Sequence, residues 1–316
     1  MRFAVIGCGN IARKYSIPAL IHSGVSSVSV CVDINPSRKQ QIQELFSLPF
    51  ESSLEEAFIR YDFDAVYIST PNASHKEIIH FAANNKKHIL CEKPAVTCLD
   101  DAMEIVEYCK KYNVALFEGF MYQFHTQHQF VRNVIDQGEI GRPFHFQAWN
   151  GFPPLNENDF RYKKALGGGA LLDAGAYTIH AARHFFNSEP VNIYAVLENE
   201  GHEVDVRGSV MFDFGNCCTA HLVFGFNNMY QNKYAIWGTK GVITLSRAFA
   251  LPPDFSSTLL LEQQGKTQEL NMEPCNHFVE EIKYFVKNVN NKVLPKLWVK
   301  EIINQATVMD KIRAIY

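Results

Sequence analysis

A glycine-rich turn close to the start of the chain is the first group of residues whose types and spacing point to chemistry. Gly7, Gly9 and Ala12 form the pattern G-x-G-x-x-A directly after the apolar run Phe3–Ile6. In this pattern the first glycine permits a tight turn, the second lets the backbone approach a pyrophosphate, and the small third residue lets a helix pack against the strand. The free N–H groups at the start of that helix would bind the phosphates. The sequence therefore predicts a dinucleotide-binding turn made by Gly7, Gly9, Asn10, Ile11 and Ala12.

An acidic residue at the end of the next apolar run indicates which dinucleotide is bound. Asp33 follows Gly9 at close to the spacing of roughly 20 residues that dinucleotide-binding domains have. Its carboxylate would accept hydrogen bonds from the adenosine ribose hydroxyls and repel a 2′-phosphate, which favours NAD. Arg38, in the turn that follows, would bind a 2′-phosphate unless it is simply solvated, so NADP remains the alternative cofactor.

Two polar segments, Ser69–Asn72 and Glu92–Pro94, each follow a further apolar run. The carboxyl ends of parallel strands form the edge at which an open α/β sheet binds ligands, so we expect both segments there. Lys93 would donate to a substrate hydroxyl or carbonyl as a fixed positive charge, although a solvated surface lysine is an alternative. A surface or capping role is likewise an alternative for His75. The expected cofactor contacts from these segments are Thr70, Pro71, Asn72, His75, Glu92 and Lys93.

A run of three glycines, Gly167–Gly169, precedes a third group of candidate residues. Three glycines in a row imply a strained turn or a close approach of the backbone to something else. Asp173 and Tyr177 are spaced i, i+4 and would share one face of a helix, with His180 three residues further along that face. An aspartate near a helix start and a core tyrosine would show the same spacing, so the pattern alone does not assign a role.

The elements that must position these residues alternate in the first third of the chain. Short apolar runs predict strands, and the stretches between them have helical patterns. This alternation is typical of a parallel, doubly wound sheet with helices on both faces, and it predicts a Rossmann domain over residues 1–118. The predicted strands are Phe3–Ile6, Val28–Val32, Ala65–Ser69, His88–Cys91 and Ala115–Phe117, and the predicted helices lie near 11–22, 36–47, 53–60, 74–85 and 98–112.

The pattern changes after about residue 120. Runs of β-type residues are separated by short turns, which favours antiparallel pairing and predicts an α+β domain over residues 119–316. Helices are expected near 126–137, 169–186, 275–290 and 297–314, with a long loop at 151–168. The predicted strands are Val191–Leu197, Val204–Phe212, Thr219–Phe226, Tyr234–Trp237, Val242–Leu245 and Thr258–Leu261.

Composition limits the partners of the protein. The 316 residues include 30 Lys and Arg against 33 Asp and Glu, so there is no electrostatic reason to expect nucleic acid or an anionic membrane. No apolar run approaches the 18 residues of a membrane span, and no signal-peptide pattern opens the chain, so we expect a cytoplasmic protein. The eight cysteines lack CxxC spacing. We interpret them as buried thiols of a reducing cytosol, with a zinc site or disulfides as the alternative, and expect no metal.

Five motifs together resemble a known family. The chain resembles the Gfo/Idh/MocA oxidoreductases, which include glucose–fructose oxidoreductase, inositol dehydrogenases and dimeric dihydrodiol dehydrogenases. The resemblance implies a Rossmann domain followed by a substrate-binding domain with an open, mostly antiparallel sheet. The C-terminal helices are then expected to pack back on the first domain. The motifs that carry the resemblance are Gly7–Ala12, Ser69–Asn72 with His75, Glu92–Pro94, Met121–His125 and Gly167–Tyr177.

The resemblance also implies roles for individual residues. Lys93 matches the lysine that contacts the reacting hydroxyl or carbonyl, and Asp173 and Tyr177 match the pair on the helix of the second domain. Tyrosine rather than histidine at position 177 is similar to the subgroup that includes nucleotide-sugar ketoreductases. Two residues depart from the common pattern: Gln123 replaces an arginine and His180 replaces an acidic residue. The expected substrate contacts are Tyr122, Gln123, Trp149, Arg161, Asp173, Tyr177 and His180.

These expectations combine into a hypothesis of reversible hydride transfer. The hydride would pass between the nicotinamide and a carbinol carbon of a sugar, a cyclitol or a nucleotide-linked sugar. Tyr177 would exchange the proton, and the Lys93 ammonium would lower the pKa of its phenol from a value near 10. A non-catalytic NAD(P)-binding sensor or scaffold is the alternative. Apolar residues on both faces of the strands at 204–237 further predict a homodimer or homotetramer through that sheet.

Overall fold

The computed structural model describes residues 1–291 and 296–315, which form two compact units. The first unit contains Met1–Phe120 and Phe278–Ile303, and the second contains Met121–His277 and the segment from Asn304 onward. The predicted boundary lay at residues 118 and 119. The C-terminal helices, placed by number in the second domain, are expected from the family resemblance to pack back on the first; in the structure Phe278–Ile303 group with the first unit.

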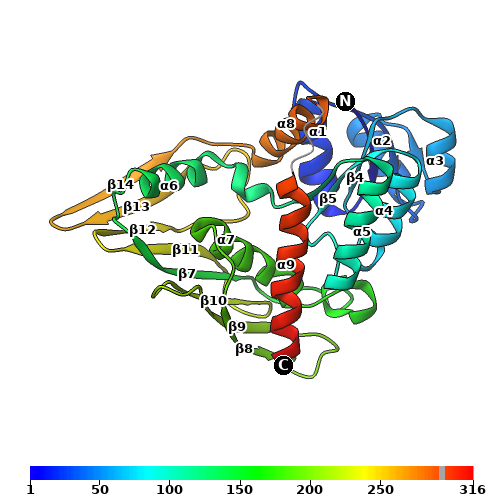
Figure 1. The fold of residues 1–316 in the computed structure, drawn as a ribbon. Helices are drawn as coiled ribbons and strands as arrows, with labels where there is room; N and C mark the ends of the chain where they lie inside the picture. The colour runs from blue at the N-terminus through cyan, green and yellow to red at the C-terminus, as the bar shows by residue number, and fades with distance from the viewer. Residues whose placement is uncertain (292–295, 316) are drawn as a thin grey trace. The chain divides into compact units, whose positions relative to one another are not determined.

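The first unit is built on a six-stranded parallel sheet with the strand order β3-β2-β1-β4-β5-β6. Its strands β4 and β5 are labelled in Figure 1. All five strand pairs are parallel, so the predicted doubly wound Rossmann sheet is confirmed. The two-residue strand β3 was not predicted, because so short a strand carries no periodicity. The strands are β1 (Arg2–Ile6), β2 (Ser27–Val32), β3 (Phe50–Glu51), β4 (Ala65–Ile68), β5 (His88–Glu92) and β6 (Leu116–Gly119).

Helices surround this sheet near the predicted positions. α4 packs on β4 and β5, and α1 packs on β2. The predicted helix over 11–22 begins with a π-helical turn, η1 (Ala12–Ser16), before α1. The other helices are α1 (Ile17–His22), α2 (Arg38–Phe46), α3 (Leu54–Arg60), η2 (Asn72–Ser74), α4 (His75–Asn84), α5 (Leu99–Tyr112) and α8 (His277–Asn290).

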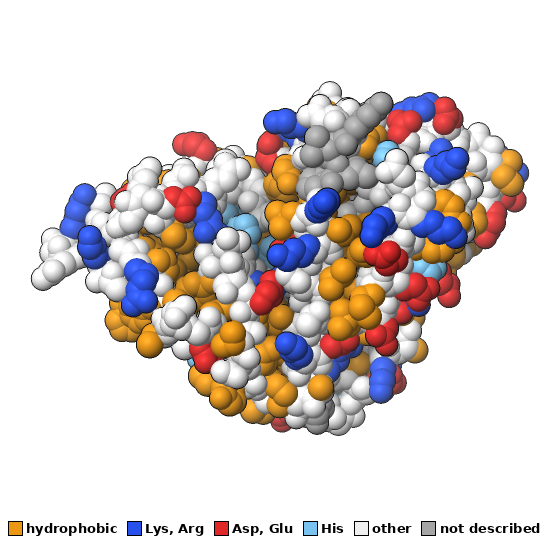
Figure 2. Space-filling model, viewed as in Figure 1, with side chains coloured by type: hydrophobic (Ala, Val, Ile, Leu, Met, Phe, Trp, Pro, Cys, Tyr) orange, Lys and Arg blue, Asp and Glu red, His pale blue; other side chains and the backbone are white. Residues whose placement is uncertain are grey.

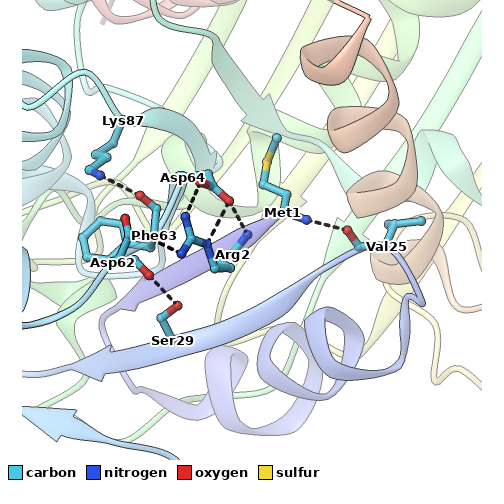
Figure 3. A network of polar contacts seen from close by, with 8 residues as sticks. All are labelled: Met1, Arg2, Val25, Ser29, Asp62, Phe63, Asp64 and Lys87. Atoms are coloured by element: carbon cyan, nitrogen blue, oxygen red, sulfur yellow. Dashed lines mark hydrogen bonds and ion pairs between the residues drawn. The ribbon is translucent and has the colours of Figure 1, made fainter.

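Polar contacts hold the amino end of β1 against its neighbours (Figure 3). The N-terminal ammonium donates to the Val25 carbonyl over 2.9 Å. The Arg2 guanidinium donates to Asp62 over 2.7 Å and to Asp64 over 2.9 Å, and the backbone N–H of Arg2 also donates to Asp64. Such exposed ion pairs contribute little free energy each. They lie at the amino ends of the strands. The predicted ligand-binding loops lie at the opposite, carboxyl edge of the sheet.

The second unit contains an eight-stranded sheet with the order β14-β13-β12-β11-β7-β10-β9-β8. Only the pair of β7 and β10 is parallel, so the predicted mostly antiparallel sheet is confirmed. Strands β7 and β14 were missed. The strands are β7 (Pro143–Gly151), β8 (Asn192–Glu198), β9 (Arg207–Asp213), β10 (Thr219–Gly225), β11 (Gln231–Gly238), β12 (Gly241–Leu245), β13 (Ser257–Gln263) and β14 (Lys266–Met272).

Helix α7 covers one face of this sheet, on β7 and β10 (Figure 1). Ala220, Leu222 and Phe224 point to the covered face and are buried, whereas the residues between them point to the other face. The opposite face exposes large apolar side chains, which we call the open face: Tyr194, Val196, Met211 and Trp237. The helical segments of this unit are η3 (Met121–Phe124), α6 (Thr126–Asp136), η4 (Phe160–Tyr162), η5 (Lys164–Leu166), η6 (Leu171–Gly175), α7 (Ala176–Phe186) and the second part of α9 (Lys296–Ile315).

This alternation separates the two apolar faces that the sequence predicts for the strands at 204–237. The apolar residues that indicate the two faces are Val210, Phe212, Leu222, Phe224, Ile236 and Trp237. The first five of them are buried, and Trp237 alone is exposed, at 53%. The open face is apolar, mainly through residues outside this set.

Positive and negative side chains are mixed on the viewed surface (Figure 2), and the cysteines are unbridged. Figure 2 shows Lys and Arg side chains interspersed with Asp and Glu over the viewed face. Within the part of the chain that the structure describes, no helix has the length and apolar character needed to cross a membrane. The eight cysteines are free thiols, of which Cys8, Cys31, Cys91 and Cys109 are buried.

Candidate active site

The glycine turn after β1 is shaped by its own neighbours. Gly7 has a φ of +91°, and a Cβ there would lie 2.8 Å from the Ser69 carbonyl carbon and from Thr70 Cγ2. Only glycine tolerates both conditions. A Cβ on Gly9 would instead meet nothing within 4 Å, so no contact within the chain requires glycine there. Open space beside Gly9 fits a residue that lets a ligand approach the backbone.

Asp33 lies at the predicted position at the end of β2. Its two carboxylate oxygens accept hydrogen bonds from the backbone N–H groups of Cys8, over 2.7 Å, and Asn35, over 2.8 Å. The side chain therefore connects the glycine turn with the turn after β2. These two donors offset part of its negative charge on the side where a ribose would bind.

Two guanidinium groups meet beside this aspartate. Arg38 donates to the Gln41 side-chain oxygen over 3.1 Å, and Arg13 donates to the same oxygen and to Asn10 Oδ1. Burial and then the nearby Arg38 charge lower the pKa of Arg13. Neither arginine forms an ion pair with any residue that the structure describes. Sequence reasoning selected Arg38 and missed Arg13, although its place one turn after the glycines was the available signal.

His75 joins the two polar loops at the carboxyl edge of the sheet. Its ring is fully buried, and both ring nitrogens contact backbone oxygens. Nδ1 lies 3.0 Å from the Pro94 carbonyl oxygen, and Nε2 lies 2.9 Å from the Thr70 carbonyl oxygen. Burial lowers the pKa of His75, although the two carbonyls oppose this effect. We expected His75 at the cofactor. The structure places it inside, between the loops that carry Thr70 and Lys93.

We expect His75→Ala to destabilise the first unit by about 2–4 kcal/mol. The substitution leaves a cavity and removes the ring whose two nitrogens contact the Pro94 and Thr70 carbonyl oxygens. Urea unfolding would measure the loss, with His22→Ala, an exposed histidine of the same unit, as the matched control. A loss no larger than that of the control would contradict a linking role for this ring.

Lys93 lies in the loop after β5, next to the half-buried Glu92. Glu92 accepts a hydrogen bond from the Tyr67 hydroxyl over 2.6 Å, so this carboxylate, expected at the cofactor, is held against β4. The Ala95 N–H donates to the Glu118 carboxylate over 2.8 Å. Lys93 itself is half-buried and precedes a cis peptide bond to Pro94. Thr70 and Pro71 are also half-buried, and Asn72 is buried.

The second unit carries Asp173 and Tyr177 at the start of one helical segment. Asp173 lies in the π-helical turn η6, and Tyr177 lies in the first turn of α7. π-Helical turns are rare and are frequent at functional sites. The Tyr177 hydroxyl donates to the sulfur of Met121 over 3.4 Å, and its ring packs near Phe249. Both side chains are half-buried, which leaves each partly accessible.

Two of the expected substrate residues are buried, and a third lies on the open face of the sheet. The Tyr122 hydroxyl and His180 Nδ1 lie 2.6 Å apart, and both side chains are buried. Trp149 lies on the open face of the sheet, where Lys233 packs on its ring and a cavity of about 300 Å³ opens. The next residue, Asn150, donates to the Ala174 carbonyl in η6. Gln123 is half-buried in η3. We do not carry Tyr122, His180 or Trp149 into the proposed site.

Arg161, expected beside the nicotinamide or an anionic group, contacts Asp173 directly. Its Nε donates to Asp173 Oδ2 over 2.6 Å, and its Nη1 donates to Asp159 Oδ1 over 3.1 Å. The negative charge of Asp173 is the largest cause that raises the pKa of Arg161. The two residues are therefore joined in one charge pair.

Comparison with known families identifies both halves of the chain. Residues 1–120 match the model described as "Oxidoreductase family, NAD-binding Rossmann fold", and residues 128–244 match the GFO/IDH/MocA C-terminal domain. The chain belongs to the GFO/IDH/MocA oxidoreductase family. It is thus an NAD(P)-dependent dehydrogenase or reductase, and the family expected from its motifs is confirmed.

Relatives of this GFO/IDH/MocA protein match it over nearly its full length. A dTDP-3,4-didehydro-2,6-dideoxy-alpha-D-glucose 3-reductase of Saccharopolyspora spinosa is 32% identical over 92% of this chain and 87% of its own. A D-xylose 1-dehydrogenase (NADP(+)) of Haloferax volcanii is 27% identical over 100% and 96%. A solved structure of a 3-ketoreductase from Actinomadura kijaniata, in complex with NADP and TDP-benzene, has a TM-score of 0.94 at 30% identity, covering 99% of this chain and 97% of that one.

Proposed function

We propose that this protein is an NADP(H)-dependent reductase of a keto group on a deoxysugar linked to thymidine diphosphate. The observation that carries the proposal is the near-full-length similarity to 3-reductases of such sugars, in sequence and in structure. The chain also retains Lys93, Asp173 and Tyr177, which a sensor or scaffold would not need. Reduction of the keto carbon would give a carbinol.

The residues of the first unit fit a dinucleotide. The open space beside Gly9 admits a pyrophosphate, and Asp33 and the two arginines lie where the adenosine ribose and its phosphate would bind. When bound, the nicotinamide supplies the hydride. The protein supplies position and charge.

Proton transfer is assigned to Tyr177. A free tyrosine has a pKa near 10, so its hydroxyl is a competent acid and a poor base at neutral pH. In the proposed mechanism the hydroxyl gives its proton to the oxygen of the keto group as that oxygen gains negative charge. The proposal requires the Lys93 ammonium to approach this oxygen and the phenol. There its charge would stabilise both the developing alkoxide and the phenolate that remains.

A substrate panel tests this function. Consumption of reduced cofactor would be followed by absorbance with TDP-linked 3-keto deoxysugars, and formation of reduced cofactor with free D-xylose. We expect rapid turnover of the TDP-linked ketone, weak or no turnover of xylose, and competitive inhibition by TDP. Turnover of xylose alone would favour an aldose dehydrogenase. Cofactor binding without turnover of any sugar would favour the sensor.

We further propose that NADP is preferred over NAD, contrary to the preference that Asp33 alone suggests. Arg13 and Arg38 form a paired cationic site, whereas the Asp33 carboxylate is engaged by two backbone N–H groups. An arginine at this position accommodates a 2′-phosphate. The pairing of two guanidiniums on one glutamine oxygen supports the same ligand, since an anion would relieve their repulsion.

We expect Arg38→Gln and Arg13→Gln each to weaken NADPH binding by about 10–100-fold and to leave NADH binding nearly unchanged. A charge-assisted hydrogen bond of about 1.5–3 kcal/mol corresponds to this factor. Titration of cofactor fluorescence measures both affinities, and Lys39→Gln, exposed in the same turn, is the matched control. Equal losses for NADPH and NADH would contradict the assignment.

The open face supports a homodimer or homotetramer through the sheet of the second unit. Val196 is 71% exposed and Trp237 is 53% exposed, and exposed apolar side chains over one face mark an interaction surface. We expect light scattering at micromolar concentration to report an oligomer, and Val196→Asp combined with Trp237→Asp to shift it to monomer. A wild-type monomer under these conditions would contradict the proposal.

A further inference from the structure

The contacts of Arg161 are unusual for a residue beside a substrate site, because its guanidinium is already engaged within the second unit. Nε donates to Asp173 over 2.6 Å, and Nη1 donates to Asp159 over 3.1 Å. The Arg161 and Asp173 side chains are only 23% and 17% exposed. A short, half-buried pair of this kind is stronger than a surface ion pair. The face of the guanidinium also packs on the Phe160 ring, at 4.7 Å from its centroid.

The backbone of Arg161 is fixed as well. Its N–H donates to Asp159 Oδ1 over 3.0 Å, and its carbonyl accepts from the Gly169 N–H over 2.9 Å. A Cβ on Gly168 would lie 2.4 Å from that same carbonyl oxygen. The close approach expected of the glycine run is therefore an approach to the chain itself. Glycine at 168 lets the start of the Asp173 segment contact the turn that carries Arg161.

The other end of the glycine run is held in the same way. Gly169 has a φ of +117°, and a Cβ there would lie 2.6 Å from Asp205 Oδ1. The second Asp205 oxygen accepts from the Leu171 N–H over 2.6 Å, so Asp205 occupies the amino end of the segment. The charged and titratable groups of this unit that lie near Asp173 in the described residues include Asp159, Arg161, Asp205 and Tyr177.

A carboxylate held in this way has a restricted chemistry. An adjacent positive charge favours the ionised form of an acid, and a carboxylate that stays ionised accepts hydrogen bonds but does not donate protons. Asp173, which accepts a hydrogen bond from Arg161 on Oδ2, is therefore suited to accept hydrogen bonds and not to give a proton.

We propose that Arg161 is a positioning residue for Asp173: its guanidinium keeps this carboxylate charged and aimed, so that Asp173 accepts hydrogen bonds from the substrate and takes no part in proton transfer. The inference rests on the proposed function, since it assigns the proton to Tyr177. Gly168 and Gly169 are the residues that let Arg161 reach this position. Arg161 itself is then engaged with Asp173 and does not bind an anionic group of the substrate.

The test compares Arg161→Met, Arg161→Lys and Lys164→Met with wild type. An NMR titration of the side-chain carboxyl resonances reports the protonation of Asp173 directly, without any substrate. The resonance that disappears in Asp173→Asn is the one that belongs to Asp173. We expect Arg161→Met to move the titration of Asp173 to higher pH, and Arg161→Lys to restore most of the wild-type behaviour. Lys164→Met, which removes an exposed positive charge three residues after Arg161, should leave the titration nearly unchanged.

The same variants have a kinetic signature. We expect Arg161→Met to lower kcat/KM by about 100-fold, the cost of misplacing a reacting group, and to add an acid limb to the pH profile that Asp173→Asn does not show. Gly168→Ala retains the Arg161 guanidinium but displaces the backbone carbonyl of Arg161. It should therefore show a smaller loss of kcat/KM and a weaker acid limb. NADPH binding checks that each variant is folded.

Two results would overturn the inference. An unchanged Asp173 titration in Arg161→Met would show that the guanidinium does not hold the charge. A kinetic loss in Arg161→Met with an unchanged pH profile would indicate a merely structural role. Because the titration needs no turnover, a failure of the proposed substrate would leave it intact, and the two failures can be told apart.

Discussion

Replacing Tyr177 with phenylalanine is expected to lower kcat for sugar reduction by about 10²–10⁴-fold, the contribution of general acid–base catalysis. The substitution removes the hydroxyl proton and little else, because the ring keeps its contact with Phe249. Lys93→Met should give a loss of similar size, since it removes the charge that stabilises the developing alkoxide. In both variants the affinity for NADPH should stay within a few-fold of wild type, as measured by fluorescence titration.

Controls for these variants are available in the chain. Tyr194→Phe removes a hydroxyl from the open face of the sheet and should leave kcat unchanged. Near-wild-type turnover in both Tyr177→Phe and Lys93→Met would remove these two residues from the mechanism. A loss that appears only in KM would instead assign them to substrate binding.

Acidification below about pH 6.5 is expected to destabilise the second unit steeply. Four histidines are buried there: His125, His128, His180 and His277. Burial lowers the pKa of His125 to about 4 and that of His277 to about 3, and it lowers the pKa of His128 and of His180 well below the ordinary value. The rings of His125 and His277 lie 5.9 Å apart, so a proton on one further disfavours a proton on the other.

The sign of this effect follows from proton binding. An unfolded histidine has a pKa of about 6.5, so below that pH the unfolded chain binds protons that the folded chain excludes. The stabilisation is complete above about pH 6.5 and is lost as the pH falls toward about 4. Each histidine that stays neutral in the fold contributes a slope of about 1.4 kcal/mol per pH unit, and four together exceed the stability of a typical domain within a few units.

Urea unfolding at about pH 7.5, 6 and 5 measures this dependence. The fluorescence of Trp149 and Trp237 reports on this unit, because both lie in its sheet. We expect the free energy of unfolding to fall steeply over this range and His125→Gln to flatten the fall. His221→Gln, at an exposed position on β10, should not change the slope. Equal stabilities at pH 7.5 and 5 would show that these histidines do not control acid unfolding.

Much of the fold could be predicted because its signals are local. Short contiguous stretches of sequence are enough to recognise the G-x-G-x-x-A turn, the buried parallel strands and the short turns of the second sheet. Strand β7 was missed because it precedes a loop rich in Gly, Pro and Asn that obscured its alternation. The grouping of residues 278–303 with the first unit depends on contacts between distant segments, which periodicity does not report.

The site was harder to predict because side-chain direction depends on the third dimension. Trp149 and Asn150 are neighbours in sequence, yet alternation along β7 sends Trp149 to the open face and Asn150 to the Ala174 carbonyl. Tyr122 and His180 bond to each other in the interior, and no spacing rule pairs residues 58 positions apart. Arg161 shows the opposite case. Its residue type suggested that it binds an anionic group of a ligand, and in the structure it binds the Asp173 carboxylate of the protein itself.

Transfer of an isotope label tests the central claim most directly. The protein would be incubated with NADPH deuterated at C4 of the nicotinamide and with a TDP-linked 3-keto deoxysugar, and the sugar product would be analysed by mass spectrometry and NMR. The account predicts a single deuterium at the former carbonyl carbon with wild-type protein, and almost none with Tyr177→Phe or Lys93→Met. Binding of both NADPH and the TDP-sugar with no deuterium in the product would contradict it.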